Sequence, residues 1–356
     1  MRKRRKGSCQ SCLTRTLRPG FTRRQVLPHF PTEHSLTHAK PGASHLTRPS
    51  VGEVTRIPRV PWRLARGARA LIGMVHLGPL PGTPRWGKDG RGAAGGGISR
   101  LAMQAAAEAA ILARAGFDGV LIENMHDAPY VMGPQDPIVV GAMTACALAV
   151  QEVLDDFRRP GRALPLGVQV LAGANEEALA VAMASGAAFI RAENFVFAHV
   201  ADEGLMARAS AGPLLRVRRS IGAEHVAIWA DIKKKHAAHA VSADVSLAET
   251  AAAAGFFGAD ALVVTGRATG RPTDPDDVSD ARRGTDEAGD RKPIVVGSGV
   301  TAATVRGLLE RADALIVGSA IKRGGSWRNP IDEGRAAAIV AARDGQAEAA
   351  RAKRGI

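Results

Sequence analysis

Short apolar runs recur along the chain from Leu71 onward, and a longer Ala-rich segment with helical character follows most of them. Most of the runs are followed directly by a polar residue or a glycine. Continuous apolar runs are typical of parallel strands that are buried on both faces. Eight such strands that alternate with helices predict an α/β fold of the closed (β/α)8 TIM-barrel type. The eight runs are Leu71–Val75, Val120–Ile122, Gly167–Val170, Ala188–Ile190, Val226–Trp229, Ala261–Val264, Pro293–Val296 and Ala314–Val317.

Residues that favour helix ends stand between these runs. Asp136 before Pro137 predicts a helix start, because the carboxylate can accept a backbone hydrogen bond and proline suits the first helical position. Asn175, followed by two glutamates, predicts a second capped start. Ser246 and Glu249 have the spacing of a capping box. The pattern therefore supports the alternation of strands and helices.

The first 66 residues lack this periodicity and are rich in Arg, Pro, Ser, Thr and His. Residues 1–60 contain 13 Lys or Arg and two acids, a balance of +11 within the net charge of +14, which leaves +3 for the rest. We predict a disordered basic tail or a misassigned start over residues 1–66 and a barrel over residues 67–356. We expect no nucleic acid on the barrel, although the tail could act as a nucleic-acid arm.

Three cysteines and the absence of a long apolar segment limit the compartment. Cys9, Cys12 and Cys146 do not make a disulfide framework, and the gap from Cys12 to His29 is too long for a zinc finger. No signal peptide or 18-residue apolar run is present. The sequence predicts a cytoplasmic protein without membrane insertion and without a recognisable metal motif. It leaves a homo-oligomer open.

Small residues follow the last two apolar runs, where barrels of this type commonly hold phosphate. These are Gly297-Ser298-Gly299 and Gly318-Ser319, with Lys322 close behind. Such loops expose backbone N–H groups to an anion at a helix N-terminus. The sequence predicts a phosphorylated small-molecule ligand here. The alternative is that both segments are only tight turns.

Three carboxylates, Glu123, Glu193 and Asp231, follow or end three different runs. Side chains at the carboxyl ends of barrel strands converge, so one of these groups could move a proton or the set could hold Mg²⁺. The alternative is that they form ion pairs with Arg191 and Lys235. No cofactor other than this Mg²⁺ is suggested.

Further polar residues stand at the ends of the runs. His76 is an acid/base candidate or a histidine bonded to a neighbouring loop, and Lys235 and His236 could offset the charge of a substrate. None of the eight runs contains lysine, which argues against Schiff-base aldolase chemistry. The remaining expected substrate contacts are Asn124, Arg191, Thr265 and Gly266.

Several of these segments resemble the BtpA/SgcQ family. The resemblance runs in order from Leu71 to Arg335 and does not include the tail. The segments that carry it are Met74–Gly82, Glu123-Asn124 with Asp127 and Pro129, Phe189–Arg191, Ala230-Asp231 with Lys235-His236, Val264–Gly266 with Thr269-Gly270, Gly297–Val300, Val317–Ser319 with Ile321-Lys322, and Asn329-Pro330 with Asp332.

The resemblance implies a barrel of the ribulose-phosphate-binding type. Part of the family is tied to photosystem I biogenesis or stability at the thylakoid surface, and other relatives occur in bacteria without photosystems. This chain departs from the family in Ala172–Asn175 and in the extra carboxylate of Glu193. Two hypotheses follow. One is an isomerase, lyase or glycosidic-bond hydrolase that acts on a phosphorylated sugar or nucleotide-like molecule. The other is a non-catalytic biogenesis factor peripheral to a membrane.

Overall fold

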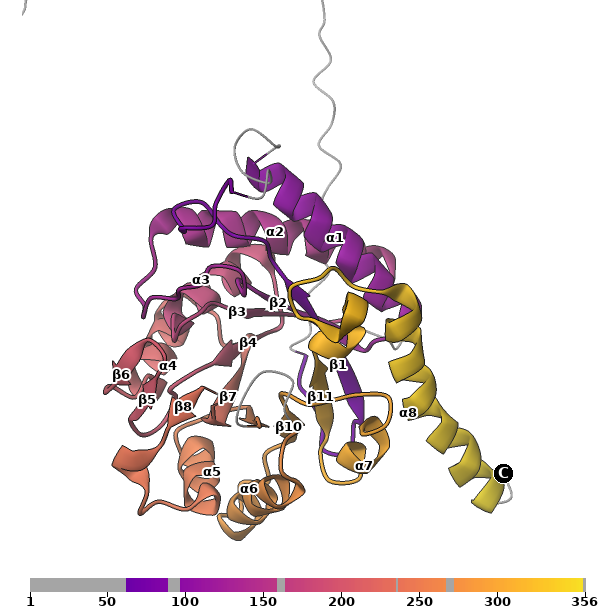
Figure 1. The fold of residues 1–356 in the computed structure, drawn as a ribbon. Helices are drawn as coiled ribbons and strands as arrows, with labels where there is room; N and C mark the ends of the chain where they lie inside the picture. The colour runs from indigo at the N-terminus through magenta and orange to yellow at the C-terminus, as the bar shows by residue number, and fades with distance from the viewer. Residues whose placement is uncertain (1–61, 89–96, 159–163, 235, 267–271, 355–356) are drawn as a thin grey trace, which may run out of the picture. The chain divides into compact units, whose positions relative to one another are not determined.

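Eight parallel strands form a closed barrel in the computed structural model, which describes residues 62–88, 97–158, 164–234, 236–266 and 272–354 (Figure 1). β1 pairs with both β2 and β11, which closes the sheet on itself. The predicted TIM barrel is confirmed, and each predicted run overlaps one strand. The strands are β1 (Ala70–His76), β2 (Gly119–Glu123), β3 (Leu166–Gln169), β4 (Phe189–Ala192), β7 (Ala227–Lys233), β9 (Ala261–Val264), β10 (Ile294–Val296) and β11 (Ala314–Val317).

Helices surround the barrel (Figure 1). Asp136 accepts a hydrogen bond from the Ile138 backbone N–H at 2.9 Å, and Ser246 forms the predicted capping box with Glu249. The prediction for Asn175 is wrong, because Ala174 is the N-cap and the Asn175 side chain bonds to the backbone of a neighbouring loop. The helices are α1 (Gly97–Ala115), α2 (Pro137–Asp156), α3 (Asn175–Ser185), α4 (Ala211–Ser220), α5 (Leu247–Phe256), α6 (Pro275–Glu287), α7 (Val305–Leu309) and α8 (Glu333–Arg354).

Short elements extend the loops at the carboxyl ends of the strands. β5 (His199–Ala201), β6 (Gly204–Met206) and β8 (Ala237–Ala238) form a three-stranded antiparallel sheet from the segments that follow β4 and β7. This sheet was not predicted. Three 3₁₀ turns, η2 (Ala240–Ser242), η3 (Ser319–Ile321) and η4 (Arg323–Gly325), complete these loops.

An aromatic stack fills the amino-terminal end of the barrel interior. The rings of Phe189 and Trp229 stack with centroids 4.0 Å apart. Trp62 lies 5.8 Å from the first ring and 5.9 Å from the second, and Leu64 is buried in the same cluster. We call Trp62, Leu64, Phe189 and Trp229 the barrel floor. Residues 62–66, assigned to the tail from the sequence, therefore pack with the barrel, whereas residues 1–61 lie outside the described structure.

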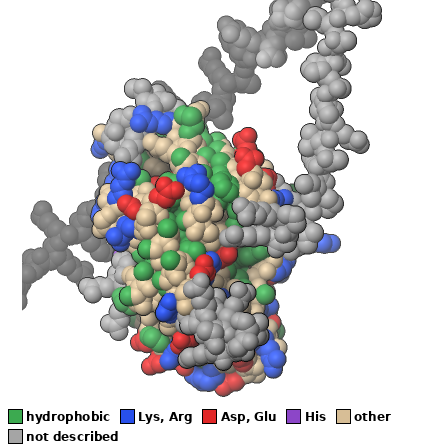
Figure 2. All heavy atoms as spheres, turned by 90° about the vertical axis from the view of Figure 1, so that its right-hand side faces the viewer, with side chains coloured by type: hydrophobic (Ala, Val, Ile, Leu, Met, Phe, Trp, Pro, Cys, Tyr) green, Lys and Arg blue, Asp and Glu red, His purple; other side chains and the backbone are tan. Residues whose placement is uncertain are grey.

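The outer surface carries charges of both signs. Figure 2 shows Lys and Arg side chains interspersed with Asp and Glu on the face that it displays. This mixture fits the near balance of charge beyond residue 60. Among the described helices, α2 is long and apolar enough to cross a membrane by length and composition. In the barrel, however, it packs against α1 and α3 and buries Val139, Met143, Cys146 and Val150.

Candidate active site

A cavity of about 360 Å³ lies at the carboxyl ends of the barrel strands. Side chains from β1, β2 and β4 form one side, and the loops after β10 and β11 form the other. The residues that sequence analysis selected and that line this cavity are His76, Glu123, Arg191, Gly297, Ser298, Gly299, Gly318 and Ser319. We call it the first cavity.

The loop after β10 requires glycine at two positions. A Cβ atom at Gly297 would lie 2.8 Å from side-chain atoms of both Thr265 and Val263, closer than real contacts allow. Gly299 has φ +75°, a left-handed conformation that favours glycine. The backbone can therefore pass close to its neighbours and still border the cavity.

Hydrogen bonds hold this loop against the loop after β9. The Ser298 hydroxyl accepts from the Gly266 backbone N–H at 2.7 Å, and the Thr273 hydroxyl donates to the Ser298 carbonyl at 3.1 Å. Thr265 is fully buried and its hydroxyl donates to the Lys233 carbonyl at 2.8 Å. Thr265 and Gly266 thus support the loop and do not line the first cavity.

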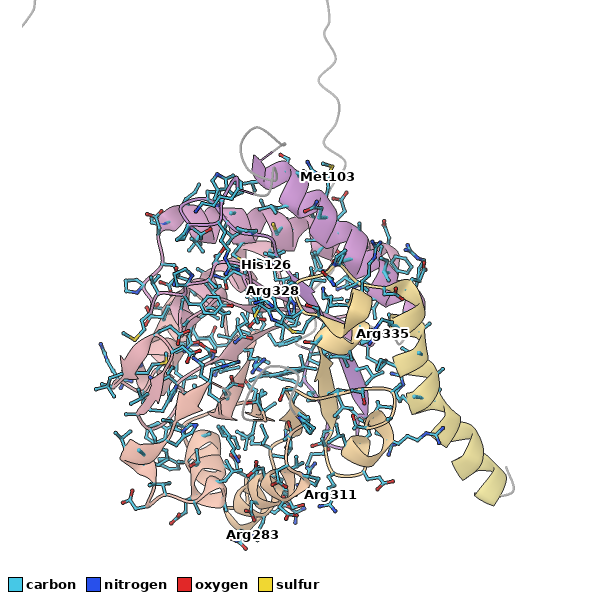
Figure 3. All side chains as sticks on the ribbon, in the orientation of Figure 1. Met103, His126, Arg283, Arg311, Arg328 and Arg335 are labelled. Carbon is cyan, nitrogen blue, oxygen red and sulfur yellow. The ribbon has the colours of Figure 1, made fainter. Side chains whose placement is uncertain are left out.

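The cation beside the two Gly-Ser loops is Arg335, which sequence analysis did not select. It stands in the first turn of α8, its side chain is exposed, and its Nε donates to the Ala320 carbonyl at 2.8 Å. Arg335 lines the first cavity (Figure 3). The sequence offers one indication of Arg335, because the family resemblance extends as far as this residue. The first turn of the helix after a strand belongs to the carboxyl end of a barrel just as the loop does.

Lys322, which was expected at the phosphate loops, has a different role. Its side chain is 1% exposed, and the ammonium donates to Glu108 of α1 at 2.7 Å. Glu108 also accepts from the Ile331 backbone N–H at 3.0 Å. Burial lowers the pKa of Lys322, and the carboxylate opposes that change. Lys322 does not line the first cavity, because its extended backbone turns the side chain towards α1.

A buried ion pair joins β4 and β7. Nε and one terminal nitrogen of Arg191 donate to the two oxygens of Asp231, each at 3.0 Å. Burial lowers the pKa of Arg191, but the charges of Asp231, Glu123 and Glu193 outweigh it and raise the pKa, so the guanidinium stays charged. Burial raises the pKa of Asp231, and Arg191 opposes that rise.

Asp231 is therefore not positioned to move a substrate proton. Its side chain is completely buried, both oxygens are bonded to Arg191, and it does not line the first cavity. Arg191 has further N–H donors and does line the cavity. The carboxylate holds the guanidinium in place, which is the ion-pair alternative that the sequence left open for this aspartate.

His76 and Glu123 end two neighbouring strands, where they are paired in register. The Nδ1 atom of His76 lies 3.0 Å from the Trp327 carbonyl, which can only accept, so this nitrogen carries the proton. Nε2 is then the basic nitrogen, and it lies 3.8 Å from Oε2 of Glu123. Both side chains line the first cavity, which makes them the acid/base candidates.

Comparison with known proteins decides the family. A model of the BtpA family matches residues 67–345. The chain belongs to the BtpA family. It is 41% identical to an uncharacterized mitochondrial protein of Caenorhabditis elegans over 274 residues, which is 77% of this chain and 92% of that protein. It is 34% identical to the photosystem I biogenesis protein BtpA of Synechocystis over 275 residues, 76% of this chain and 87% of that protein.

Solved structures are similar to this BtpA-family chain at low sequence identity. The N-(5′-phosphoribosyl)anthranilate isomerase of Pyrococcus furiosus aligns with a TM-score of 0.43 and 12% identity, over 78% of this chain and 99% of that one. This similarity concerns the barrel architecture alone.

The carboxylate by which this BtpA-family member departs from the expected pattern, Glu193, lies in a second charged cluster. It accepts from the Gly173 backbone N–H at 2.8 Å and lies 3.3 Å from the ammonium of Lys234. Burial lowers the pKa of Lys234, but Glu193 and Glu203 outweigh it and raise the pKa. Sequence analysis did not select Lys234. Glu193 does not line the first cavity.

Other residues carried by the family resemblance support loops. Asn124 accepts from the Leu171 backbone N–H at 2.8 Å and donates to Asp127 at 2.9 Å. Asp127 also accepts from the Leu80 backbone N–H at 2.8 Å, and burial raises its pKa to about 6. His236 is exposed, 3.7 Å from Asp202, and outside the first cavity.

Two site predictions stay predictions. Lys235 lies outside the described residues. Within the described ranges, no three His, Cys, Asp or Glu side chains are grouped so as to hold a metal ion. Of the three carboxylates offered for Mg²⁺, Glu123 lines the first cavity, whereas Glu193 and Asp231 are engaged with Lys234 and Arg191.

Proposed function

We propose that this BtpA-family barrel is an enzyme that acts on a phosphorylated small molecule, of the sugar-phosphate or nucleotide-like class. One observation carries the proposal: a single cavity combines two Gly-Ser loops and Arg335 with His76 and Glu123. The first set is suited to an anion, and the second set is suited to proton transfer.

The anion is bound by backbone and cations together. In this proposal the phosphate accepts from backbone N–H groups that follow Gly297, whose own N–H donates to the Val264 carbonyl at 2.8 Å, and from those of the loop that starts at Gly318, while Arg335 neutralises it from α8. Arg191 adds further N–H donors held in one orientation, because Asp231 fixes its guanidinium with two hydrogen bonds. A neutral sugar lacks the charge that these groups recognise.

Proton transfer is assigned to His76 with Glu123. The Trp327 carbonyl fixes the tautomer of His76, so that Nε2 accepts a substrate proton, and Glu123 stabilises the imidazolium that forms. The proposed reaction is that of an isomerase or a lyase and begins when Nε2 abstracts the substrate proton. A glycosidic-bond hydrolase is the third reaction type considered. Mg²⁺, a homo-oligomer and a cytoplasmic location remain expectations.

Binding by the full-length chain tests the proposal. Isothermal titration calorimetry with ribose 5-phosphate, inorganic phosphate and ribose, with and without Mg²⁺, compares phosphorylated with neutral probes. We expect both phosphorylated probes to bind and ribose not to bind. Arg335→Ala should weaken phosphate binding by about tenfold or more, because a charge-assisted hydrogen bond contributes roughly 1.5–3 kcal/mol.

A matched control removes an equal charge elsewhere. Arg216 is exposed on α4 and donates to the Gly212 carbonyl, outside the cavity. Arg216→Ala should bind phosphate as the wild type does. If both variants weaken binding equally, the effect is one of net charge and the assignment of Arg335 fails.

The second candidate function is a non-catalytic biogenesis factor that uses the barrel as a scaffold. The name of the Synechocystis relative favours it. Relatives from Caenorhabditis elegans and from Pyrococcus furiosus, the latter 33% identical over 273 residues, favour a role that does not depend on a photosystem. If no phosphorylated probe binds the wild type, the scaffold hypothesis is preferred.

A further inference from the structure

A second cavity of about 360 Å³ lies beside the first and shares His76 with it. Its walls come from the end of β1, from α1 and from the segment that follows β11. That last segment contributes to both cavities, since Gly325 lines the first and Arg323 lines the second. His76, the proposed acid/base residue, therefore lines both spaces. The phosphate proposed for the first cavity does not occupy the second cavity.

The lining of the second cavity is cationic. Arg100 from α1, Arg323 and Arg328 line it together with His126. The guanidinium of Arg328 lies 4.5 Å from the centre of the Trp327 ring, and the His126 ring is 5.1 Å from the same ring. Figure 3 labels His126 and Arg328, which approach this wall from the loops after β2 and β11.

The single acid in this lining, Glu108, is already neutralised. Its two oxygens accept from the Lys322 ammonium at 2.7 Å and from the Ile331 backbone N–H at 3.0 Å. Lys322 is 1% exposed, so this pair is part of the wall. Both oxygens of Glu108 are thus engaged, and the other ionisable side chains that the structure describes in this lining are arginines and histidines.

The segment that presents the arginines is fixed at both ends. Glu108 contacts its first residue, Lys322, and its last, Ile331, which also form a β-bridge with each other. Within the segment, the Arg323 backbone N–H donates to the Pro330 carbonyl at 3.0 Å, and the Asn329 amide donates to the Arg323 carbonyl at 2.8 Å. These bonds hold the arginine backbones at the cavity before any ligand arrives.

We propose that the second cavity binds a second anionic group of the same ligand, so that the substrate carries a phosphate at one end and another phosphate or a carboxylate at the other. The inference rests on the proposed function of the first cavity. Arg323 and Arg328 pair with the second anion, and His76 faces the carbon skeleton between the two charged ends. A substrate with two anionic ends is thereby held in one direction across the acid/base pair.

The test compares probes that differ by one anionic group on the full-length chain. Ribulose 5-phosphate has one phosphate, ribulose 1,5-bisphosphate has two, and 6-phosphogluconate has a carboxylate at the far end. We expect at least one of the doubly anionic probes to bind about tenfold or more tightly than ribulose 5-phosphate by calorimetry. Whichever of the two binds more tightly identifies the second group.

Arg323→Ala with Arg328→Ala should abolish this advantage and leave the affinity for ribulose 5-phosphate within about twofold. Arg216→Ala with Arg219→Ala is the matched control, because both arginines are exposed on α4 and the charge removed is equal. Arg335→Ala should weaken all three probes and preserve the advantage.

The outcomes separate the two proposals. Equal affinity of the wild type for all three probes overturns the second anion site and leaves the first intact. The same conclusion follows if the Arg323/Arg328 variant still binds a doubly anionic probe more tightly than ribulose 5-phosphate. If the Arg323/Arg328 double variant weakens every probe by the same factor, the proposal is also overturned, since these two arginines then act only through net charge. If no probe binds the wild type, the proposed function itself fails.

Discussion

The two ends of the barrel interior are built on the same strands but have opposite chemistry. In β4, Phe189 belongs to the apolar floor and Arg191, two residues later, lines the first cavity. In β7, Trp229 belongs to the floor and Asp231, two residues later, bonds to Arg191. Alternate residues of a strand share one face, so each pair points into the same interior. A step of about 7 Å along the strand separates stacking rings from an ion pair.

This contrast separates stability from function. The floor excludes water and gains free energy from buried apolar area. The Arg191–Asp231 pair must overcome the desolvation of two charges, and pairs of this kind often contribute little net stability. We infer that the floor stabilises the barrel, whereas the pair holds the remaining N–H donors of Arg191 at the cavity.

Breaking the ion pair has the largest expected effect. Asp231→Ala leaves a buried guanidinium without its partner, which should lower the free energy of unfolding by about 3–5 kcal/mol. Urea unfolding monitored by circular dichroism measures this change. The variant should also bind inorganic phosphate more weakly, because Arg191 loses the two bonds that orient it.

Replacing both partners by apolar residues sharpens the contrast. Arg191→Met with Asp231→Leu should recover most of the stability lost in Asp231→Ala, because neither charge of the pair is left buried without its partner. Phosphate binding should remain weak. A double variant that binds phosphate as the wild type does would show that Arg191 has no part in anion recognition.

The pH dependence of stability should distinguish the mouth of the barrel from its floor. Burial raises the pKa of Asp127 from about 3.8 to about 6, against the hydrogen bonds from Leu80 and Asn124. Between these values the folded state holds a proton that the unfolded state has lost. The carboxyl therefore stabilises the fold fully below about pH 4, and this contribution of about 3 kcal/mol is lost as the pH rises through about 6.

Asp127→Asn provides the comparison, because an amide does not titrate in this range. Urea unfolding of both proteins from about pH 4 to about pH 7 should show the difference in stability narrowing or reversing as the pH rises. A difference that is constant over this range would contradict the raised pKa.

The smallest expected effect tests the edge of the floor. Trp62→Ala removes a ring that contacts both Phe189 and Trp229, and should lower the free energy of unfolding by about 2 kcal/mol because the ring is only partly buried. Trp62→Phe keeps an aromatic ring and should retain most of the stability. Affinity for inorganic phosphate in the folded protein should not change, since Trp62 lies outside the first cavity.

The strands were predictable because each is buried on both faces and so reads as an uninterrupted apolar run. The Gly-Ser loops were predictable because their position follows from counting strands in a known architecture. The small sheet of β5, β6 and β8 was not, since its strands have two or three residues and carry no long pattern.

Side-chain partners were harder to predict than positions. Lys322 stands next to a Gly-Ser loop in the sequence but reaches Glu108, which is 214 residues away. Arg335 is farther along the chain yet lines the first cavity. The chain passes through η3, η4 and the following segment and then comes back to this cavity at the start of α8. The sequence left Asp231 open as a proton carrier or as a partner of Arg191, and only the bidentate geometry shows that both of its oxygens are engaged.

The contact between Glu108 and Lys322 cannot form during synthesis until the last barrel unit has been made. It joins the first barrel unit to the last, as does the pairing of β1 with β11. Early barrel units leave the ribosome well before the residues that close them, and such long-range contacts make closure slow. Because both cavities use residues from the two ends of the barrel, neither is complete in a nascent chain that still lacks the residues after β11.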